Sequence, residues 1–310
     1  MNPAPDAEHP RPASDASLSA DDAALSARLL SHVEMLAGTI GPRHFGRPGS
    51  IETTLAWLRD QISACGVTAT EQTYIARGHH ATNLIVDIPG RTDKWLVIGA
   101  HYDTVPSTPG ADDNASAVAI LLETLRLTAE WQPRIGLRFC AYACEEPPFF
   151  GTKSMGSFQH AAACRAAGDR LVGMVCLEML GFFEPDAKPK WPNEIPRFAR
   201  PLLPKRSDFI AAVGDLRSFR FVRRFAAGFR AASQLSLLPM NLPRRVRAIE
   251  LSDNRSYWDH GYRALMLTDT SFLRNPHYHQ PTDTPETLDP DRMALVVRGV
   301  VGGARRICKA

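Results

Sequence analysis

The sequence predicts an α/β fold, a three-layer sandwich built on a largely parallel, mixed central sheet. Two observations lead to this prediction. Short apolar runs of strand length alternate with helical patterns over most of the chain, and several of those runs end directly at ionisable residues. The 310 residues are 44% hydrophobic and 22% charged, which is enough apolar sequence for a sizeable core and excludes collagen-like, low-complexity and mostly disordered chains.

The first part of the chain is predicted to be a tail followed by two helices. Residues 1–17 are rich in Pro, Ala, Ser and Asp without periodicity, so we expect a mobile tail there and a single domain over 18–310. Apolar residues at helical spacing predict a helix over 18–38, which ends before a Gly-Pro pair. A second helix is expected over 50–65, where Gly66 stops it.

The remaining elements alternate between strands and helices. Short apolar runs bounded by turn residues predict buried strands, and apolar positions at helical spacing predict the helices between them. In chain order, we expect strands over 83–89 and 95–100, a helix over 114–130, a strand over 135–144, a helix over 151–167, a strand over 171–177, a helix around 216–232, a strand over 263–268 and a closing helix over 289–308.

Residues 185–250 interrupt this alternation and carry most of the positive charge. The segment has a net charge of +9, which leaves −6 for the remainder of a chain whose total is +3. We expect a basic insertion or lid within the domain. A solvated face with local ion pairs is the simpler interpretation of the charge, and attraction of acidic substrates is the functional one. No nucleic-acid reading motif accompanies the charge, so we expect no nucleic-acid partner.

Composition also bears on the compartment. No window supplies about 20 nearly uncharged apolar residues, so we expect no membrane span. The first residues lack a basic start followed by an apolar run, and six cysteines without a CxxC pair favour reduced thiols over disulfides. We therefore expect a cytoplasmic protein, with export by a route lacking a recognisable signal as the alternative.

Ionisable residues stand where predicted strands end and in two polar loops. In open α/β sheets, ligands bind in the crevice beyond the carboxyl ends of the strands, so we expect these side chains to meet there. They are His101 and Asp103, Glu145 and Glu146, and Glu178 at three strand ends, Asp113 in a turn before a helix, and His279 in a loop after the last strand.

Two imidazoles and several carboxylates without a thiolate form a ligand set for zinc, with cobalt or manganese as alternatives. Carboxylates gathered without a metal repel one another, and a pair of dications relieves that repulsion. Each residue also has a structural interpretation: an internal salt bridge for Glu178, a helix-dipole contact for Asp113 and a loop cap for Asp103. Taken together, the candidates favour a site for two metal ions.

Four motifs resemble, in order and spacing, those of metallopeptidase family twenty-eight, which contains dinuclear zinc aminopeptidases, glutamate carboxypeptidases and glutaminyl cyclases. They are HYDTVPSTPGADDNASA, YACEEPPFFGTKSMGS, CLEMLGFF and NPHYHQPTDTPETLD. The match also takes in IGPRHFGRPGS and NLIVDIPG, and it covers most of residues 30–308. The resemblance implies the zinc-exopeptidase form of the predicted fold, with a metallopeptidase catalytic domain over 18–310.

Carried over residue by residue, the resemblance implies two zinc ions. His101 and Glu178 would bind one zinc, Glu146 and His279 would bind the other, and Asp113 would bridge the two.

The resemblance also implies two catalytic roles. Glu145 would be the unligated general base that takes a proton from the bridging water and gives it to the leaving amine. Asp103 would hold the second nitrogen of the His101 imidazole. Asp283 is a similar candidate for a supporting role or a turn.

Three departures from the family pattern leave all ligand positions filled. Glu178 stands where aminopeptidases of this group often have Asp, and its longer side chain reaches further. Ala117 stands where the motif usually has Gly. Ser252, Asp253 and Asn254 replace a frequent Ser-Asp-His.

The sequence as a whole indicates a zinc-dependent exopeptidase, foremost an aminopeptidase acting on peptides or aminoacyl amides. A metallo-carboxypeptidase or amidohydrolase is the alternative, because the basic segment could favour substrates that end in a carboxylate. Glutaminyl cyclisation is less favoured since all five ligand positions are filled. A catalytically silent binding scaffold is disfavoured by the presence of Glu145.

Overall fold

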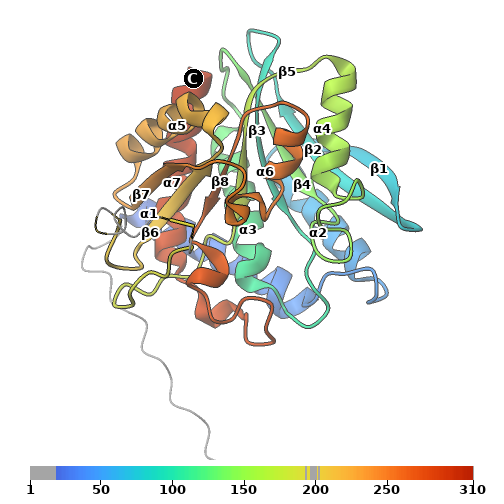
Figure 1. Cartoon of the computed structure of the whole chain (residues 1–310). Coiled ribbons are helices and arrows are strands. Elements are labelled where there is room, and N and C mark those ends of the chain that lie inside the picture. Colours follow the sequence, from blue (N-terminus) through green and yellow to red (C-terminus); the bar gives the residue numbers. More distant parts are fainter. Residues whose placement is uncertain (1–18, 193, 196–200, 202, 310) are drawn as a thin grey trace, which may run out of the picture.

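The computed structural model describes residues 19–192, 194–195, 201 and 203–309, and the predicted tail over 1–17 lies outside these residues. Helices cover both faces of an eight-stranded mixed sheet, which confirms the predicted three-layer α/β fold (Figure 1). The strands are β1 (Thr70–Ala76), β2 (His79–Ile88), β3 (Lys94–His101), β4 (Gly136–Tyr142), β5 (Arg170–Glu178), β6 (Phe209–Gly214), β7 (Ser236–Asn241) and β8 (Ala264–Thr268). The helices are α1 (Ala20–Val33), α2 (Ser50–Ala64), α3 (Ala117–Thr128), α4 (Gly156–Ala167), α5 (Phe219–Ala232), α6 (Asn254–Asp259) and α7 (Pro290–Cys308).

The strand order places the ends of four parallel strands at one edge. The order is β1-β2-β4-β3-β5-β8-β6-β7. Strands β4, β3, β5 and β8 run parallel to one another, whereas β2 is antiparallel to both β1 and β4, and β6 is antiparallel to β8. The residues that follow β3, β4, β5 and β8 therefore leave the sheet at a common edge, as a ligand crevice requires.

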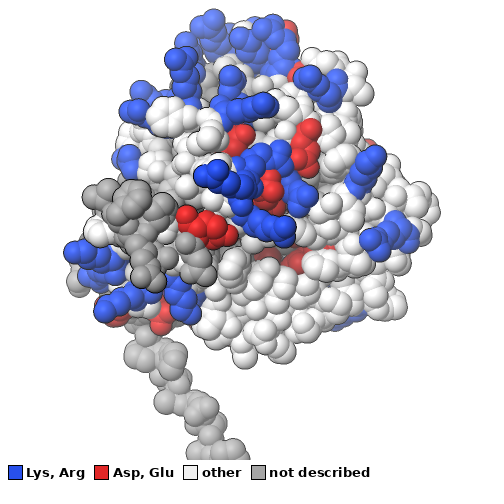
Figure 2. All heavy atoms as spheres, viewed as in Figure 1, with Lys and Arg blue, Asp and Glu red and all other residues white. Residues whose placement is uncertain are grey.

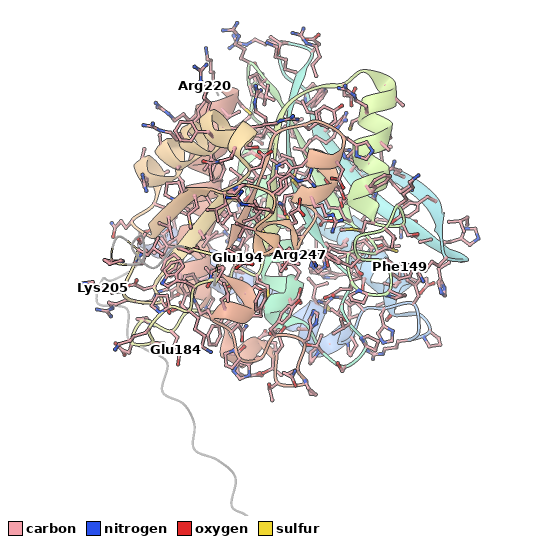
Figure 3. The ribbon with its side chains drawn as sticks, in the orientation of Figure 1. Phe149, Glu184, Glu194, Lys205, Arg220 and Arg247 are labelled. Atoms are coloured by element: carbon pink, nitrogen blue, oxygen red, sulfur yellow. The ribbon has the colours of Figure 1, made fainter. Side chains whose placement is uncertain are left out.

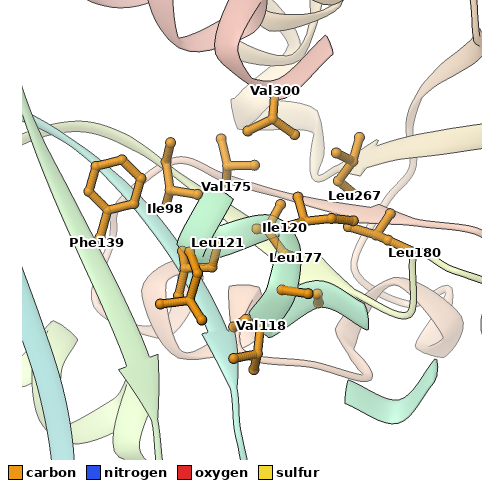
Figure 4. Packing of buried hydrophobic residues seen from close by; sticks show 14 of the residues in the cluster. Ile98, Val118, Ile120, Leu121, Phe139, Val175, Leu177, Leu180, Leu267 and Val300 are labelled. Atoms are coloured by element: carbon orange, nitrogen blue, oxygen red, sulfur yellow. The ribbon is translucent and has the colours of Figure 1, made fainter. Parts of the chain in front are cut away.

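The core has two layers because alternate residues of each strand face opposite sides of the sheet. On β3, Leu96, Ile98 and Ala100 pack with the layer that holds α1, α3, α5 and α7, while Val97 packs with the opposite layer. Figure 4 shows the first layer, in which Ile98 and Val175 of the sheet lie between residues of α3 and Val300 of α7. On the other face α6 packs against α4 and β5.

Most predicted elements are confirmed in type and order, whereas β1, β6, β7 and α6 were not predicted and α4 begins later than expected. The strand expected over 83–89 begins earlier, because β1 and β2 form a hairpin around Gly78. Strand β1 was not predicted, since its residues alternate between exposed and half-buried and include few apolar side chains.

The basic segment over 185–250 contributes two strands to the sheet. Strands β6 and β7 and the intervening helix α5 all lie within it. Phe221, Phe225 and Phe229 of α5 are buried against the core, and its arginines take the opposite face. A lid function remains a prediction for the parts of the segment outside these elements.

All six cysteines are free in the structure. Among the described residues, no helix combines the length and apolarity that a bilayer crossing requires.

Candidate metal centre

One half of the site forms where two parallel strands end side by side. His101 is the last residue of β3 and Glu178 is the last residue of β5, its neighbour in the sheet. Nε2 of His101 lies 3.4 Å from Oε2 of Glu178 and 3.4 Å from Oδ1 of Asp113. All three side chains are buried.

The other half of the site combines three loops around the same aspartate. Nε2 of His279 lies 3.1 Å from Oδ2 of Asp113 and 3.3 Å from Oε1 of Glu146. In each half the three candidate ligand atoms lie within 4.8 Å of one another. Asp113 therefore faces one histidine with each of its carboxylate oxygens, and the structure brings together all five residues predicted from the sequence.

Several of these atoms have no hydrogen-bond partner. Within the described part of the chain, Nε2 of His101, Oδ1 of Asp113, Oε1 of Glu146 and Nε2 of His279 are buried and unpaired. Buried polar atoms normally have hydrogen-bond partners, so unpaired nitrogen and oxygen atoms that converge in two groups are typical of side chains that bind cations. The donor set and its burial fit two divalent cations.

The charges in the cluster also favour cations. Burial, followed by repulsion from Asp113, raises the pKa of Glu146 to about 8. Burial likewise raises the pKa of Glu145 well above its usual range. Burial alone would lower the pKa of His279, but the nearby carboxylates of Asp113 and Glu146 raise it to about 10. Without cations the cluster must retain protons, which metal ions would displace.

Two further aspartates hold the backbone of the ligand loops. The carboxylate of Asp103 accepts hydrogen bonds from the backbone N–H groups of Glu145 and Glu146, each at 3.1 Å. The carboxylate of Asp283 accepts from the N–H groups of Asp112 and Asp113, at 2.9 and 3.1 Å. Each clamp ties a metal-facing segment to a loop that is remote in sequence.

The contact between Asp103 and His101 differs from the expectation. Nδ1 of His101 lies 3.2 Å from the backbone carbonyl oxygen of Asp103 but 3.7 Å from its carboxylate. The carboxylate is turned away because it accepts the two amide hydrogen bonds just described. Asp103 therefore contacts the imidazole through its main chain.

Sequence reasoning missed two residues that support the site. Oγ of Ser252 donates a 2.6 Å hydrogen bond to Oε2 of Glu178, and only the departure from Ser-Asp-His drew attention to this loop. Arg43 is fully buried and donates to the carbonyl oxygens of Tyr102 and Gly110, both at 2.8 Å, on either side of the loop between β3 and Asp113. Arg43 belongs to the IGPRHFGRPGS stretch, but nothing in its spacing indicates these partners.

An apolar pocket opens beside Glu178. Its lining includes Val213, Met240, Leu242, Ile249 and Met266, together with the ring of Tyr278. The Tyr278 ring stacks on the His279 imidazole with centroids 3.8 Å apart, so the pocket wall continues into the ligand cluster.

Two large apolar side chains border the same pocket and reach its surface. They are Leu251, which is 41% exposed, and Phe272, which is 45% exposed.

Comparisons with known proteins agree with this geometry. The sequence model of peptidase family M28 matches residues 83–302. The uncharacterized protein YfbL of Escherichia coli (strain K12) is 37% identical over 278 residues, which cover 87% of this chain and 84% of that protein. The probable leucine aminopeptidase 1 of Trichophyton verrucosum (strain HKI 0517) is 28% identical over 273 residues, which cover 82% of this chain and 66% of that protein.

Solved structures share the fold at low sequence identity. The zinc aminopeptidase of Bacillus subtilis superposes with a TM-score of 0.68 at 14% identity, covering 91% of this chain and 95% of that one. The glutaminyl cyclase of Fimbriiglobus ruber superposes with a TM-score of 0.66 at 19% identity, covering 96% of this chain and 99% of that one.

Proposed function

The chain belongs to peptidase family M28, and from this premise we propose that it is a zinc-dependent aminopeptidase that releases apolar residues from the N-terminus of peptides. The observation that carries the proposal is the pair of ligand groups that share Asp113. His101 and Glu178 would hold one zinc ion, and Glu146 and His279 would hold the other. When bound, the two ions supply Lewis acidity toward a peptide carbonyl and a water molecule.

We assign the role of general base to Glu145. Its Oε2 lies 3.9 Å from Nε2 of His101, so it borders the cluster, yet it belongs to neither ligand group. A buried carboxylate with a raised pKa accepts a proton from water and returns it to a leaving amine more readily than an exposed one. The Asp103 clamp fixes the backbone of Glu145 and thereby its distance from the cluster.

The substrate preference follows from the pocket beside Glu178. Aliphatic and sulfur-containing side chains dominate its lining, and among the described lining residues Glu178 is the only acidic or basic one. A charged substrate side chain would lose its hydration there without gaining a partner, whereas an apolar one would gain contact area. The names of relatives such as the probable leucine aminopeptidase 1 of Trichophyton verrucosum support the same preference.

The test is a substrate panel combined with zinc quantification. Zinc-loaded protein is assayed on the p-nitroanilides of Leu, Met, Glu and Lys, and on N-acetyl-Leu p-nitroanilide as the blocked control. We expect kcat/KM for Leu and Met to exceed that for Glu and Lys by at least about tenfold. We also expect no hydrolysis of the acetylated substrate.

Two results would contradict the proposal. Release of C-terminal residues from N-acetylated peptides, with free-amine anilides untouched, would instead support the carboxypeptidase or amidohydrolase interpretation. Cyclisation of N-terminal glutamine without any hydrolysis would instead support glutaminyl cyclase activity. The glutaminyl cyclase of Fimbriiglobus ruber has a similar fold.

A further inference from the structure

Two large apolar side chains at the start of α5 are exposed to solvent. Leu216 is 61% exposed and Phe219 is 49% exposed, and they stand three positions apart. Of the other large apolar side chains that are exposed in the described part of the chain, Leu251 and Phe272 border the substrate pocket and Ile75 lies on edge strand β1. Leu216 and Phe219 serve neither the pocket nor the core.

The turn that carries them is held in place. The carboxylate of Asp215 accepts hydrogen bonds from the backbone N–H of Ser218 at 2.8 Å and from its hydroxyl at 2.5 Å. Nδ2 of Asn241 donates to the carbonyl oxygen of Asp215 at 2.7 Å, and the N–H of Ala264 donates to Oγ of Ser218 at 3.2 Å. The backbone that carries Leu216 and Phe219 is therefore held by these hydrogen bonds.

Three arginines flank the two side chains in the sequence. Arg217, Arg220 and Arg223 are exposed, and none of them forms an ion pair within the described residues. The Arg223 guanidinium lies 5.4 Å from the centre of the Phe219 ring. In Figure 3, Arg220 points outward from the α5 end of the molecule, and Figure 2 shows Lys and Arg gathered along the same upper border.

The cationic surface continues onto the starts of the parallel strands. Arg263 immediately precedes β8, and its carbonyl oxygen accepts a hydrogen bond from Met174 of β5 at 2.9 Å. Lys94 and Arg170 are paired in register at the starts of β3 and β5. Of these, only Arg170 has an acidic partner within the described chain, Asp93 at 3.0 Å.

Strands β3 and β5 begin at this surface and end at the metal centre. The two sites therefore occupy opposite edges of the sheet. A flat partner bound at the α5 edge would leave the ligand cluster and the substrate pocket accessible.

We propose that the surface formed by Leu216, Phe219 and the surrounding cations docks on an anionic lipid bilayer. Leu216 and Phe219 enter the interfacial region of the bilayer, while Arg217, Arg220 and Arg223 contact lipid phosphates. A bilayer satisfies both parts of this surface at once, because it offers apolar and anionic groups within a few ångströms. A nucleic-acid backbone would match the arginines and leave the two apolar side chains without a favourable contact.

The test is sedimentation of the full chain with lipid vesicles. Phosphatidylcholine vesicles are compared with vesicles containing about 30 mol% phosphatidylglycerol, at about 0.05 M and about 0.5 M salt. We expect binding to the anionic vesicles at low salt, and a bound fraction that falls at high salt. The double variants L216S/F219S and R217Q/R220Q should each weaken binding by about tenfold or more.

Matched variants separate this surface from a general effect of apolarity or charge. I75S removes an exposed apolar side chain from β1, and R245Q/R247Q removes two exposed cations from another surface. Both should bind vesicles like the unmodified protein. L216S/F219S should keep its thermal midpoint and its rate on soluble substrates, because both side chains are exposed and remote from the metal centre.

Three outcomes would overturn the proposal. The first is the absence of anionic-vesicle binding by the unmodified chain at low salt. The second is equal binding by the two surface variants and the unmodified chain, or equal weakening by the matched variants. The third is binding to a DNA duplex, weakened by R217Q/R220Q, in the absence of vesicle binding, which would assign the surface to nucleic acid.

Discussion

At the residue scale, the geometry of the candidate metal centre depends on two carboxylates, those of Asp103 and Asp283, that are not themselves predicted metal ligands. Asp103 and Asp283 each accept two hydrogen bonds from consecutive backbone amides of the segments carrying Glu146 and Asp113. Both oxygens of each carboxylate accept an N–H group, so these aspartates hold the backbone and belong to neither ligand group. Asp103 and Asp283 instead fix the positions of the predicted metal ligands Glu146 and Asp113.

The five predicted ligands and the two predicted catalytic residues lie together in the structure, but their individual contacts could not be predicted from the sequence. The family resemblance implies a supporting role for Asp103, and Asp283 is a similar candidate for a supporting role or a turn. Their amide partners lie 42 and 170 positions away, and only the assembled loops bring them into contact. The hydrogen bond from Ser252 to Glu178 could not be predicted for the same reason, because only the tertiary structure brings the two residues together.

Glu145 gives the sharpest test at this scale. Glu145→Gln keeps the size of the side chain and removes its capacity to accept a proton, so turnover should fall by about 10²–10⁴-fold. Zinc content should be unchanged, since Glu145 lies outside both ligand groups. The measurement is kcat on Leu p-nitroanilide together with zinc per chain by atomic absorption. Loss of zinc from this variant would contradict the assignment of Glu145 as an unligated base.

At the element scale, helices were easier to predict than edge strands. The helical stripe that includes Leu25 and Leu29 is continuous, and burial in α1 follows it closely. Strands β6 and β7 lie in a segment whose basic charge suggested an insertion. The arginines of α5 give the segment its basic charge, although they lie on the face of that helix opposite the core. The charge of the whole segment therefore did not indicate the two apolar strands.

The contact between α1 and α3 predicts an acid-sensitive contribution to stability. Glu123 of α3 is buried, and its carboxylate contacts Arg28 at 3.0 Å and His32 at 3.2 Å, both on α1, as well as Arg126. Burial would raise the pKa of Glu123, but the hydrogen bonds from His32, Arg126 and Arg28 lower it to about 2. The stabilisation is therefore present in full above the ordinary glutamate pKa of about 4.3 and is lost as the pH falls toward 2.

Glu123→Gln should accordingly lower the free energy of unfolding by about 1–3 kcal/mol at pH 7, as measured by urea denaturation. The difference from the unmodified protein should shrink as the pH is lowered from 5 to about 3. Glu71→Gln is the matched control, because the ion pair of Glu71 with Arg59 is exposed and should contribute less than about 1 kcal/mol. Equal stability of Glu123→Gln and the unmodified protein at pH 7 would rule out this account of the α1–α3 contact.

At the scale of the whole molecule, the parallel sheet that defines the fold class also brings the predicted metal ligands together. Once strands and helices alternate, a parallel sheet directs the residues that follow its strands to one edge. His101 and Glu178 follow this rule directly, as the last residues of β3 and β5. His279 is not a strand residue but lies in a loop beyond β8, with a positive φ of 58°. Its position in a polar loop after the last strand predicts that it reaches the crevice, and the family resemblance implies its role as a ligand.

This arrangement makes metal binding a property of the folded chain. The ligands come from five separate segments, so the unfolded chain cannot assemble them, and zinc should stabilise the native state. Free zinc at about one hundred times Kd contributes about 2.7 kcal/mol for one site, which corresponds to a rise in Tm of roughly 5 °C or more. The measurement is Tm by calorimetry with zinc and after dialysis against a chelator.

Asp113→Ala distinguishes a shared ligand from two independent sites. Because Asp113 faces both histidines, its removal should reduce zinc binding in both halves and abolish most of the zinc-dependent rise in Tm. Glu130→Ala, which removes an exposed carboxylate at the end of α3, should keep the full rise and the full zinc content. If Asp113→Ala retained two zinc ions per chain and the full rise, the two halves would be independent. The shared aspartate would then be a structural neighbour of the metals, and the geometry that supports an aminopeptidase would lose its central element.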